Sequence, residues 1–191
     1  MGVLPDVAGS GVGPGGAGPA RAAAGAGEHN PQTPEKIALG DKLFHDQRFS
    51  STGEVSCATC HDVKKAFTDS PLKVSEGIEK LTGTRNAPTV INSAYFTTLF
   101  WDGRSPDRED QSRHPFVNPV EMGLANHEPI LEIVRNDPEY APAFQQVFGK
   151  SGEQIALTEV IQAIAAFERT IPTPISSIFP ATSSCATGIA A

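Results

Sequence analysis

Two cysteines and a histidine stand together in the run Cys57-Ala58-Thr59-Cys60-His61. The Cys-x-x-Cys-His spacing is typical of a c-type haem, in which both thiols bond to the porphyrin and the adjacent imidazole binds the iron. A chain with 3 cysteines and 5 histidines in 191 residues rarely contains this run by chance. We therefore predict one covalent haem c, attached through Cys57 and Cys60, with His61 as an axial ligand of the iron.

Two other uses of a Cys-x-x-Cys pair stay open at this point, a structural zinc site and a redox-active dithiol. A zinc site needs two further ligands at comparable spacing, whereas the third cysteine is Cys185, far along the chain. A thioredoxin-like dithiol is expected beside a βαβ pattern, which this sequence does not show. The spacing therefore favours haem over both.

Composition limits the partners. The net charge is −7 and 39% of the residues are apolar, enough for one domain with a core plus tails. An acidic chain with an isoelectric point near 5.2 is a poor match for nucleic acid. No run approaches the roughly 18 apolar residues of a membrane span. An acidic face would suit a basic electron-donor protein, although a modest negative charge is more often only a solvated surface.

The two ends of the chain differ from its middle. Half of the 18 glycines lie in the first 27 residues, so we predict a flexible Gly/Ala/Pro-rich segment over 1–32. Arg21 is the only Lys or Arg there, and Gly or Pro interrupts every apolar stretch, so a signal peptide is not recognisable. Because haem c is attached outside the cytoplasm, we still expect a periplasmic protein, whose start lies upstream or whose chain is longer. Residues 172–191 are predicted to be an irregular tail, the remnant of a truncated second domain.

The middle, residues 33–171, carries helix signals. Thr33-Pro34-Glu35 combines an N-cap hydroxyl, a proline at the first helical position and an acid in the first turn. Similar signals predict helices over 33–46, 105–113, 127–135, 137–149 and from Thr158 onward, the last with an apolar 3.6-residue period. Gly40 would allow a flat ring or another backbone to come close to the first helix, although it could also be only a tolerated helix glycine. Strand alternation is weak and 63–100 is mostly turns, so we predict an all-α, cytochrome c-like haem domain with long loops.

The loops hold further candidate residues. Glu121 lies between Pro119 and Gly123 in a run with few charges, which raises its interest above that of an ordinary surface acid. Trp, Gln and paired Pro and Gly residues occur in the same region. The segments concerned are Arg85-Asn86-Ala87-Pro88-Thr89, Phe100-Trp101-Asp102-Gly103-Arg104, Gln111, and Asn118-Pro119-Val120-Glu121-Met122-Gly123.

Together with further motifs, these segments resemble the bacterial di-haem cytochrome c peroxidases and the related MauG proteins, which mature methylamine dehydrogenase. The resemblance covers about residues 35–170. Besides the haem motif and the loop segments, it rests on Leu39-Gly40-Asp41-Lys42-Leu43-Phe44, Ala66-Phe67-Thr68-Asp69 and Ala163-Ile164-Ala165-Ala166-Phe167-Glu168-Arg169-Thr170.

The resemblance implies the N-terminal domain of such an enzyme, which carries the peroxidatic haem. It makes His61 the proximal ligand, Glu121 the distal acid and Gln111 the hydrogen-bonding partner of Glu121. The implied reaction is the reduction of hydrogen peroxide to water, with electrons from a small donor protein, a cytochrome c or a cupredoxin. A carboxylate over the iron would move a proton between the peroxide oxygens, and an amide would stabilise the developing charge.

Two further roles follow only from the resemblance. Trp101 matches the aromatic residue between the two haems of the family, although a buried core tryptophan would explain it equally well. Asn86 matches a ligand of a calcium ion at the seam between the domains, although taken alone it would more often be a turn residue.

The chain also departs from the family. It has no second Cys-x-x-Cys-His, and Ile78 stands where many members have a histidine that caps the resting iron. We therefore expect that this loop does not cap the iron. The alternative to an enzyme is a mono-haem electron carrier, which needs a strong sixth ligand; Met122, His114 and His127 are its candidates.

Overall fold

A computed structural model describes residues 30–171 of the chain. The predicted tail over 172–191, with Cys185, and the predicted flexible segment up to residue 29 lie outside the described residues. Asn30 is already buried, and its amide donates to a Glu109 carboxylate oxygen over 2.6 Å. Tertiary contacts are therefore already present three residues before the predicted domain start at residue 33.

The described chain is helical, which confirms the all-α prediction. It contains no β-strand within residues 30–171, only three isolated bridges. The α-helices are α1 (Pro34–His45), α2 (Cys57–Cys60), α3 (Arg108–Val117), α4 (Glu128–Asn136), α5 (Tyr140–Phe148) and α6 (Leu157–Glu168). Short 3₁₀ helices are η1 (Gln47–Phe49), η2 (Val63–Lys65), η3 (Ile78–Lys80), η4 (Ser93–Tyr95) and η5 (Gly152–Gln154).

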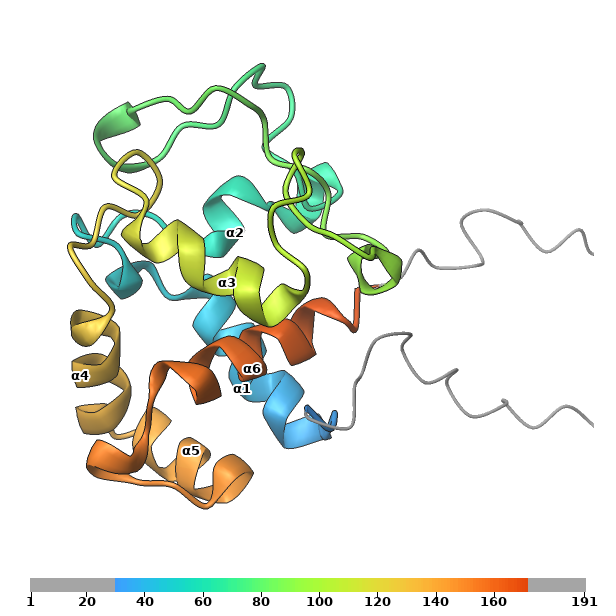
Figure 1. Ribbon diagram of the computed structural model, residues 1–191. Helices are drawn as coiled ribbons and strands as arrows, with labels where there is room; N and C mark the ends of the chain where they lie inside the picture. The colour runs from blue at the N-terminus through green and yellow to red at the C-terminus, as the bar shows by residue number, and fades with distance from the viewer. Residues whose placement is uncertain (1–29, 172–191) are drawn as a thin grey trace, which may run out of the picture.

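Helices α1 and α6 cross at the centre of the molecule (Figure 1). Gly40 makes this crossing close, because a Cβ added there would overlap the backbone carbonyl of Ala163. The close approach predicted for Gly40 is thereby confirmed. Helix α3 lies across α6, and α4 and α5 close the other side. The largest fully buried apolar side chains come from these helices, η1 and the turn before α6: Leu43, Phe44, Phe49, Phe116, Ile130, Val134, Phe144, Ile155, Val160 and Ile164.

Three predicted helix starts differ from the structure. Helix α5 begins at Tyr140, three residues after the predicted start at Asp137, whose carboxylate accepts the Tyr140 N–H over 3.1 Å. Helix α3 begins after Asp107, not at Ser105, because the Asp107 carboxylate accepts the Asp110 N–H over 2.7 Å. Helix α6 begins after Ala156, before the predicted cap Thr158. There the Glu159 carboxylate accepts the Ala156 N–H over 2.9 Å, so the acid inside the first turn fixes the start. The first helix, with Thr33 as its N-cap, begins as predicted.

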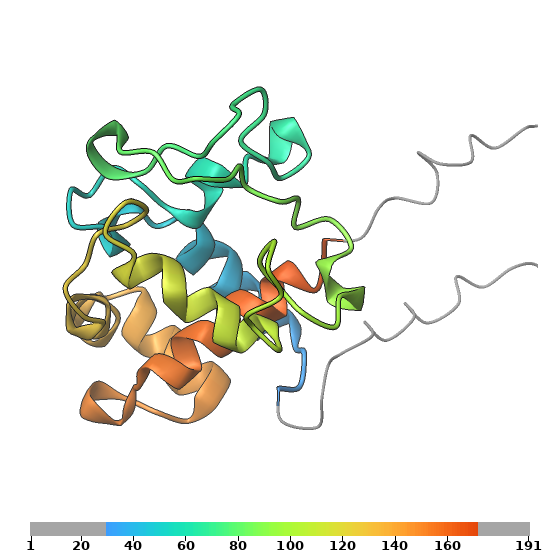
Figure 2. The same cartoon turned by 45° about the horizontal axis from the view of Figure 1, so that its top comes forward.

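Residues 61–105 form a second region, which we call the loop half. It runs over the side of α2 and α3 opposite to α4 and α5, as Figures 1 and 2 show in teal to green. Its turns are joined by side chains bonding to backbone: the Thr89 hydroxyl donates to the Ala66 carbonyl over 2.6 Å. As predicted, it contains turns and extended chain with only single 3₁₀ turns.

Candidate active site

The cysteines of the Cys-x-x-Cys-His run lie on a single helical turn, α2, which follows Ser56. The Thr59 hydroxyl accepts the Ser56 N–H over 2.9 Å and fixes the start of this turn. Both thiols are unbridged and partly buried. Burial, together with nearby acids, raises the pKa of Cys60 to about 11 and that of Cys57 further still. Because a redox dithiol needs a lowered thiol pKa, this environment does not suit one.

The structure does not assemble a zinc site around the motif either. Within residues 30–171, no group of three or more His, Cys, Asp or Glu side chains is arranged to hold a metal ion. A haem iron needs fewer protein ligands than zinc, because the porphyrin supplies most of its ligands and the chain needs to provide one imidazole.

The surroundings of His61 suit an iron ligand. Its Nδ1 lies 3.2 Å from the carbonyl oxygen of Phe67, which accepts the ring hydrogen and leaves Nε2 as the metal-binding nitrogen. Burial lowers the pKa of His61, against the opposing effects of the Phe67 and Pro88 carbonyls and the Asp69 charge. A neutral imidazole is the form that binds a metal. Cys57, Cys60 and His61 thus fit a c-type haem: two protonated thiols on one turn and an oriented, neutral histidine beside them.

Asp69 joins three loop segments next to this motif, a role that sequence reasoning missed. Its carboxyl is buried, and Oδ2 accepts hydrogen bonds from the Ser75 hydroxyl and the Ala87 N–H. Oδ1 is buried without a hydrogen-bond partner in the described part of the chain. The Asp69 charge contributes to the raised pKa of Cys60. The signal in the sequence was the Phe-Thr-Asp segment itself, which carried the resemblance without a stated function.

Glu121 lies in a turn that follows α3. The backbone bonds of this turn run from Gly123 N–H to the Asn118 carbonyl and from Met122 N–H to the Pro115 carbonyl, so the chain turns back along the end of α3. The Ile78 N–H donates to the Glu121 carbonyl over 3.0 Å, which brings the loop half against this turn. A Cβ at Gly77 would overlap the backbone of the same turn.

The carboxyl of Glu121 is held by Asn118, whose side-chain amide donates to Oε1 over 2.7 Å. Burial raises the pKa of Glu121, against lowering by the charge of Arg104, the Asn118 hydrogen bond and the charge of His114. Glu121 also contributes to the raised pKa values of Cys57 and Cys60, so the acid and the haem-attachment motif face a common region. A partly buried acid with a raised pKa beside a cofactor site is a typical proton-transfer group.

Gln111 lies on α3 and shares its face with Pro115 and Asn118, by the spacing of a helix. Its side chain makes no hydrogen bond to Glu121 in the described structure, where the Glu121 carboxyl is bonded by Asn118 instead. The direct hydrogen bond predicted between Gln111 and Glu121 is therefore absent from the described structure. The structure assigns the direct contact to a residue that sequence reasoning left without a role.

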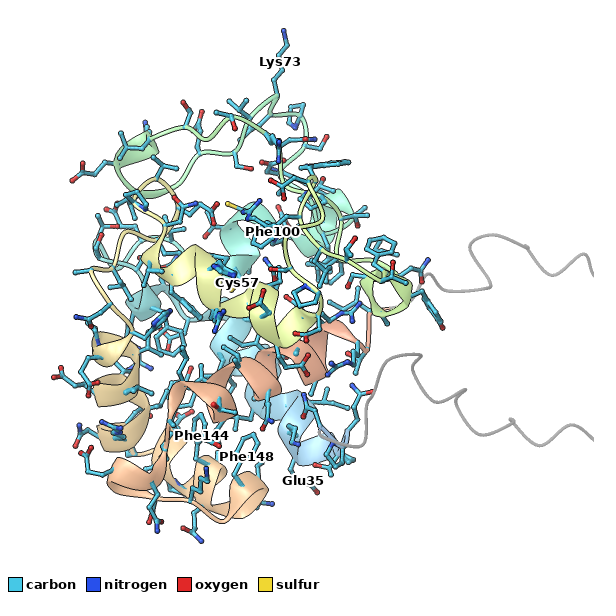
Figure 3. All side chains as sticks on the ribbon, in the orientation of Figure 1. Glu35, Cys57, Lys73, Phe100, Phe144 and Phe148 are labelled. Carbon is cyan, nitrogen blue, oxygen red and sulfur yellow. The ribbon has the colours of Figure 1, made fainter. Side chains whose placement is uncertain are left out.

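Trp101 lies on the surface of the loop half, with 59% of its area exposed, so the alternative of a buried core tryptophan is wrong. Its ring is fixed, because Nε1 donates to the Asn86 carbonyl over 2.9 Å. Asn86, the proposed calcium ligand, is exposed, and its backbone carbonyl positions the ring of Trp101. Figure 3 labels Phe100, the neighbour of Trp101, on the same side of α1 as Cys57, whereas Phe144 and Phe148 lie at the far end.

Each candidate for a strong sixth ligand has contacts with other groups in the described structure. Met122 is 2% exposed and belongs to the apolar core. His127 Nε2 lies 2.9 Å from the Arg113 carbonyl oxygen, and His114 Nε2 lies 3.4 Å from Oδ2 of Asp110. Ile78, at the position of the capping histidine, is buried, and its side chain lies against Gly123.

Comparison with known proteins identifies the family of the chain. The family described as di-haem cytochrome c peroxidase matches residues 34–180. The chain belongs to the di-haem cytochrome c peroxidase family. The match extends ten residues beyond residue 170, where the sequence pattern was predicted to end.

Individual members of this family are similar over one part of their length. The methylamine utilization protein MauG of Methylorubrum extorquens is 42% identical over 142 residues, which is 74% of this chain and 39% of that protein. A cytochrome c551 peroxidase of Pseudomonas aeruginosa is 37% identical over 75% of this chain and 41% of its own length. The chain thus spans about two fifths of the length of these relatives.

A solved structure confirms the fold of this part. A MauG-like protein associated with microbial copper homeostasis superposes with a TM-score of 0.70 at 36% identity, covering 76% of this chain and 43% of that one. The all-α, cytochrome c-like fold class is therefore shown. Within the described residues no helix is long and apolar enough to cross a membrane.

Proposed function

We propose that this chain forms the peroxide-reacting haem domain of a di-haem peroxidase, with haem c held by Cys57, Cys60 and His61. The observation that carries the proposal is Glu121: a partly buried acid of raised pKa, fixed by Asn118, close enough to the haem-attachment turn to affect both thiols. The haem, when bound, supplies the iron at which peroxide is reduced.

The residues of the chain would handle the protons of the reaction. Reduction of one hydrogen peroxide to two water molecules consumes two electrons and two protons. In this proposal the Glu121 carboxylate takes a proton from the peroxide oxygen that approaches the iron and returns it to the oxygen that leaves as water. Asn118 keeps the carboxyl in one orientation, while Gln111, from the same face of α3, supplies an amide for the developing charge.

The electrons would come from a small redox protein, a cytochrome c or a cupredoxin, through a second haem domain that meets the surface of Trp101. Asn86 would provide part of a calcium site at that seam. Calcium prefers 6–8 oxygen ligands, so we expect weak binding by this chain. We also propose a periplasmic location, since haem c is attached outside the cytoplasm.

Glu121→Gln tests the proposal, because it keeps the size of the side chain and removes its proton. In haem-loaded protein we expect the second-order rate of the ferric form with peroxide, measured by stopped flow, to fall roughly 10²–10⁴-fold. Glu128→Gln is a matched control, since Glu128 lies on the exposed surface of α4, where its carboxylate pairs with Arg135. Equal peroxide rates in the wild type and Glu121→Gln would show that the catalytic assignment is wrong.

The ferric absorption spectrum separates this proposal from the electron carrier. Because Met122 is in the core and Ile78 replaces the capping histidine, we expect a high-spin spectrum with an open sixth position. A low-spin spectrum in the resting protein would favour the carrier. Rapid first oxidation by peroxide followed by slow, calcium-insensitive turnover is expected from a chain without the second haem.

A further inference from the structure

A second titratable group lies beside the proposed catalytic acid. His114 is on the last turn of α3, with 42% of its side chain exposed, and its Nε2 is 3.4 Å from Oδ2 of Asp110. Asp110 is itself fixed, because the Ser105 hydroxyl donates to it over 2.7 Å and Arg113 pairs with it over 2.7 Å. The imidazole thus contacts both solvent and a rigidly held carboxylate.

The backbone brings this histidine close to Glu121. Met122 N–H donates to the carbonyl of Pro115 over 3.3 Å. Glu121 directly precedes Met122 and His114 directly precedes Pro115, so this bond brings their backbones close together. The charge of His114 also acts on the Glu121 carboxyl. On its other side, the His114 ring meets Phe100 edge to face, with 5.8 Å between ring centroids.

Phe100 closes the neighbouring face of this site. Its φ of 64° is unusual for a residue with a large side chain. The Arg104 guanidinium lies 3.4 Å from the centre of its ring, and Asp102 pairs with that guanidinium. The charged groups that face His114 and Glu121 are therefore Asp110 and Arg113 from α3 and Arg104 from the loop half.

Glu121 needs a route for protons. Its carboxyl is partly buried and bonded to Asn118, while each peroxide reduced draws two protons from solvent. We propose that His114, backed by Asp110, carries protons between solvent and Glu121. This inference rests on the proposed function, since it assigns a supply to the acid invoked there.

The step is a simple proton exchange. The protonated His114 ring gives one proton to the Glu121 carboxylate, which becomes the neutral acid, and the neutral ring then takes a proton from solvent. Asp110 stabilises the protonated ring and fixes its orientation, as a carboxylate commonly does for a histidine that transfers protons. A relay of this kind changes the rates of proton-coupled steps in both directions and leaves their equilibria unchanged.

The chain offers a matched control. On α1, His45 and Asp41 form another i,i+4 pair, with Nδ1 to Oδ1 at 3.1 Å and 50% of the histidine side chain exposed. This pair lies on a different helix and does not contribute to the pKa of Glu121. His45→Gln therefore removes an equivalent surface imidazole without touching the proposed route.

The test compares His114→Gln, His45→Gln and the wild type as haem-loaded full chains. In His114→Gln we expect steady-state peroxide turnover with a small-molecule reductant to fall about tenfold, with recovery on adding 2,6-lutidine, a proton carrier too hindered to bind iron. The first reaction with peroxide should keep its rate, because Glu121 returns to the leaving oxygen the proton that it takes. Cyanide provides a readout besides activity, because hydrogen cyanide must lose a proton when it binds. Its association and dissociation rates should both fall about tenfold in His114→Gln, with an unchanged Kd, while His45→Gln keeps wild-type rates.

Three results would overturn the relay. Wild-type turnover and cyanide rates in His114→Gln would show that protons reach Glu121 by another route. A changed cyanide Kd without recovery by lutidine would indicate a structural role instead. A ferric spectrum that changes spin state in His114→Gln would make His114 a ligand of the iron. Failure of Glu121→Gln to slow peroxide would instead contradict the proposed function, so the two failures are distinguishable.

Discussion

The helical frame, which we define as α1 and α3–α6, and the loop half differ in how far they bury their large apolar side chains. Among the described residues, every exposed large apolar side chain lies within 61–105: Val63, Leu72, Leu81, Tyr95, Phe96 and Trp101. The largest fully buried apolar side chains all lie outside that segment. The frame is therefore stabilised by its own core, whereas the loop half exposes apolar surface that its own packing does not cover.

Backbone conformation shows the same contrast. Every non-glycine residue with positive φ in the described chain lies between Ala66 and Phe100. Such conformations persist only where the surroundings determine them strongly, and here the surroundings are side-chain bonds such as those of Asp69, Thr89 and Trp101. The comparison indicates that packing stabilises the frame, while side-chain bonds to the backbone stabilise the loop half; we predict that the loop half also depends on the proposed haem.

The largest effect should come from removing haem attachment. In Cys57→Ala/Cys60→Ala we expect haem to be extracted completely by acid–acetone, because both thioether bonds are lost. Amide hydrogen exchange should then show protection retained in α1 and α6 and lost over 61–105. Haem that stays covalently bound in this variant would contradict the assignment, and uniform loss of protection would contradict the contrast between the two regions.

Sequence patterns predicted the frame better than the loop half, for physical reasons. Helix caps and a 3.6-residue apolar period are local signals, so α1, α4 and α5 begin or end near the predicted residues. The predicted starts at Ser105 and Thr158 were wrong because the carboxylates of Asp107 and Glu159, further along the chain, accept hydrogen bonds from the first amides of these helices. Local spacing alone does not decide between competing caps.

The predictions about the site divide in the same way. Cys57, Cys60 and His61 lie within five residues, so their role in haem attachment can be predicted from their spacing. The Asn118 contact to Glu121 depends on the turn after α3, and the exposure of Trp101 depends on how the loop half folds. An aromatic residue in a loop has the same sequence signature whether it faces a core or a partner, and only the fold separates the two.

The frame should be sensitive to its buried ion pair between α3 and α6. Arg169 donates to both oxygens of Glu109, over 2.6 and 2.8 Å, and its side chain is 4% exposed. Glu109→Gln leaves that guanidinium buried without its charge partner, so we expect a loss of about 3–5 kcal/mol in the free energy of unfolding, measured with urea. The double variant Glu109→Gln/Arg169→Met should recover part of it, and a loss below about 1 kcal/mol would show that the frame does not depend on this pair.

Glu168 makes the stability of the frame depend on pH. Burial raises its pKa to about 7, against lowering by the charges of Arg108 and Arg169. The folded protein therefore holds this proton more tightly than the unfolded chain does. The stabilisation is fully present below the unfolded pKa, near 4.5, and is lost as the pH rises through about 7.

We expect this group to contribute about 3 kcal/mol at pH 4, declining to none above pH 8. Urea unfolding of Glu168→Gln should lack that decline, so its stability relative to the wild type should increase with pH. Glu132→Gln, at an exposed position of α4, is the control. Parallel pH profiles for the wild type and Glu168→Gln would show that the buried carboxyl titrates normally.

The smallest effect should come from the exposed surface of the loop half. Trp101→Phe removes the hydrogen bond to the Asn86 carbonyl but leaves an aromatic ring that is already largely exposed. We expect the free energy of unfolding to change by no more than about 1 kcal/mol, whereas Phe116→Ala, at a fully buried position of α3, should cost about 3–5 kcal/mol. A large loss in Trp101→Phe would mean that Trp101 stabilises this domain by itself. A small loss would leave the exposed ring available for a contact outside the chain, which is the role that the resemblance implies for it.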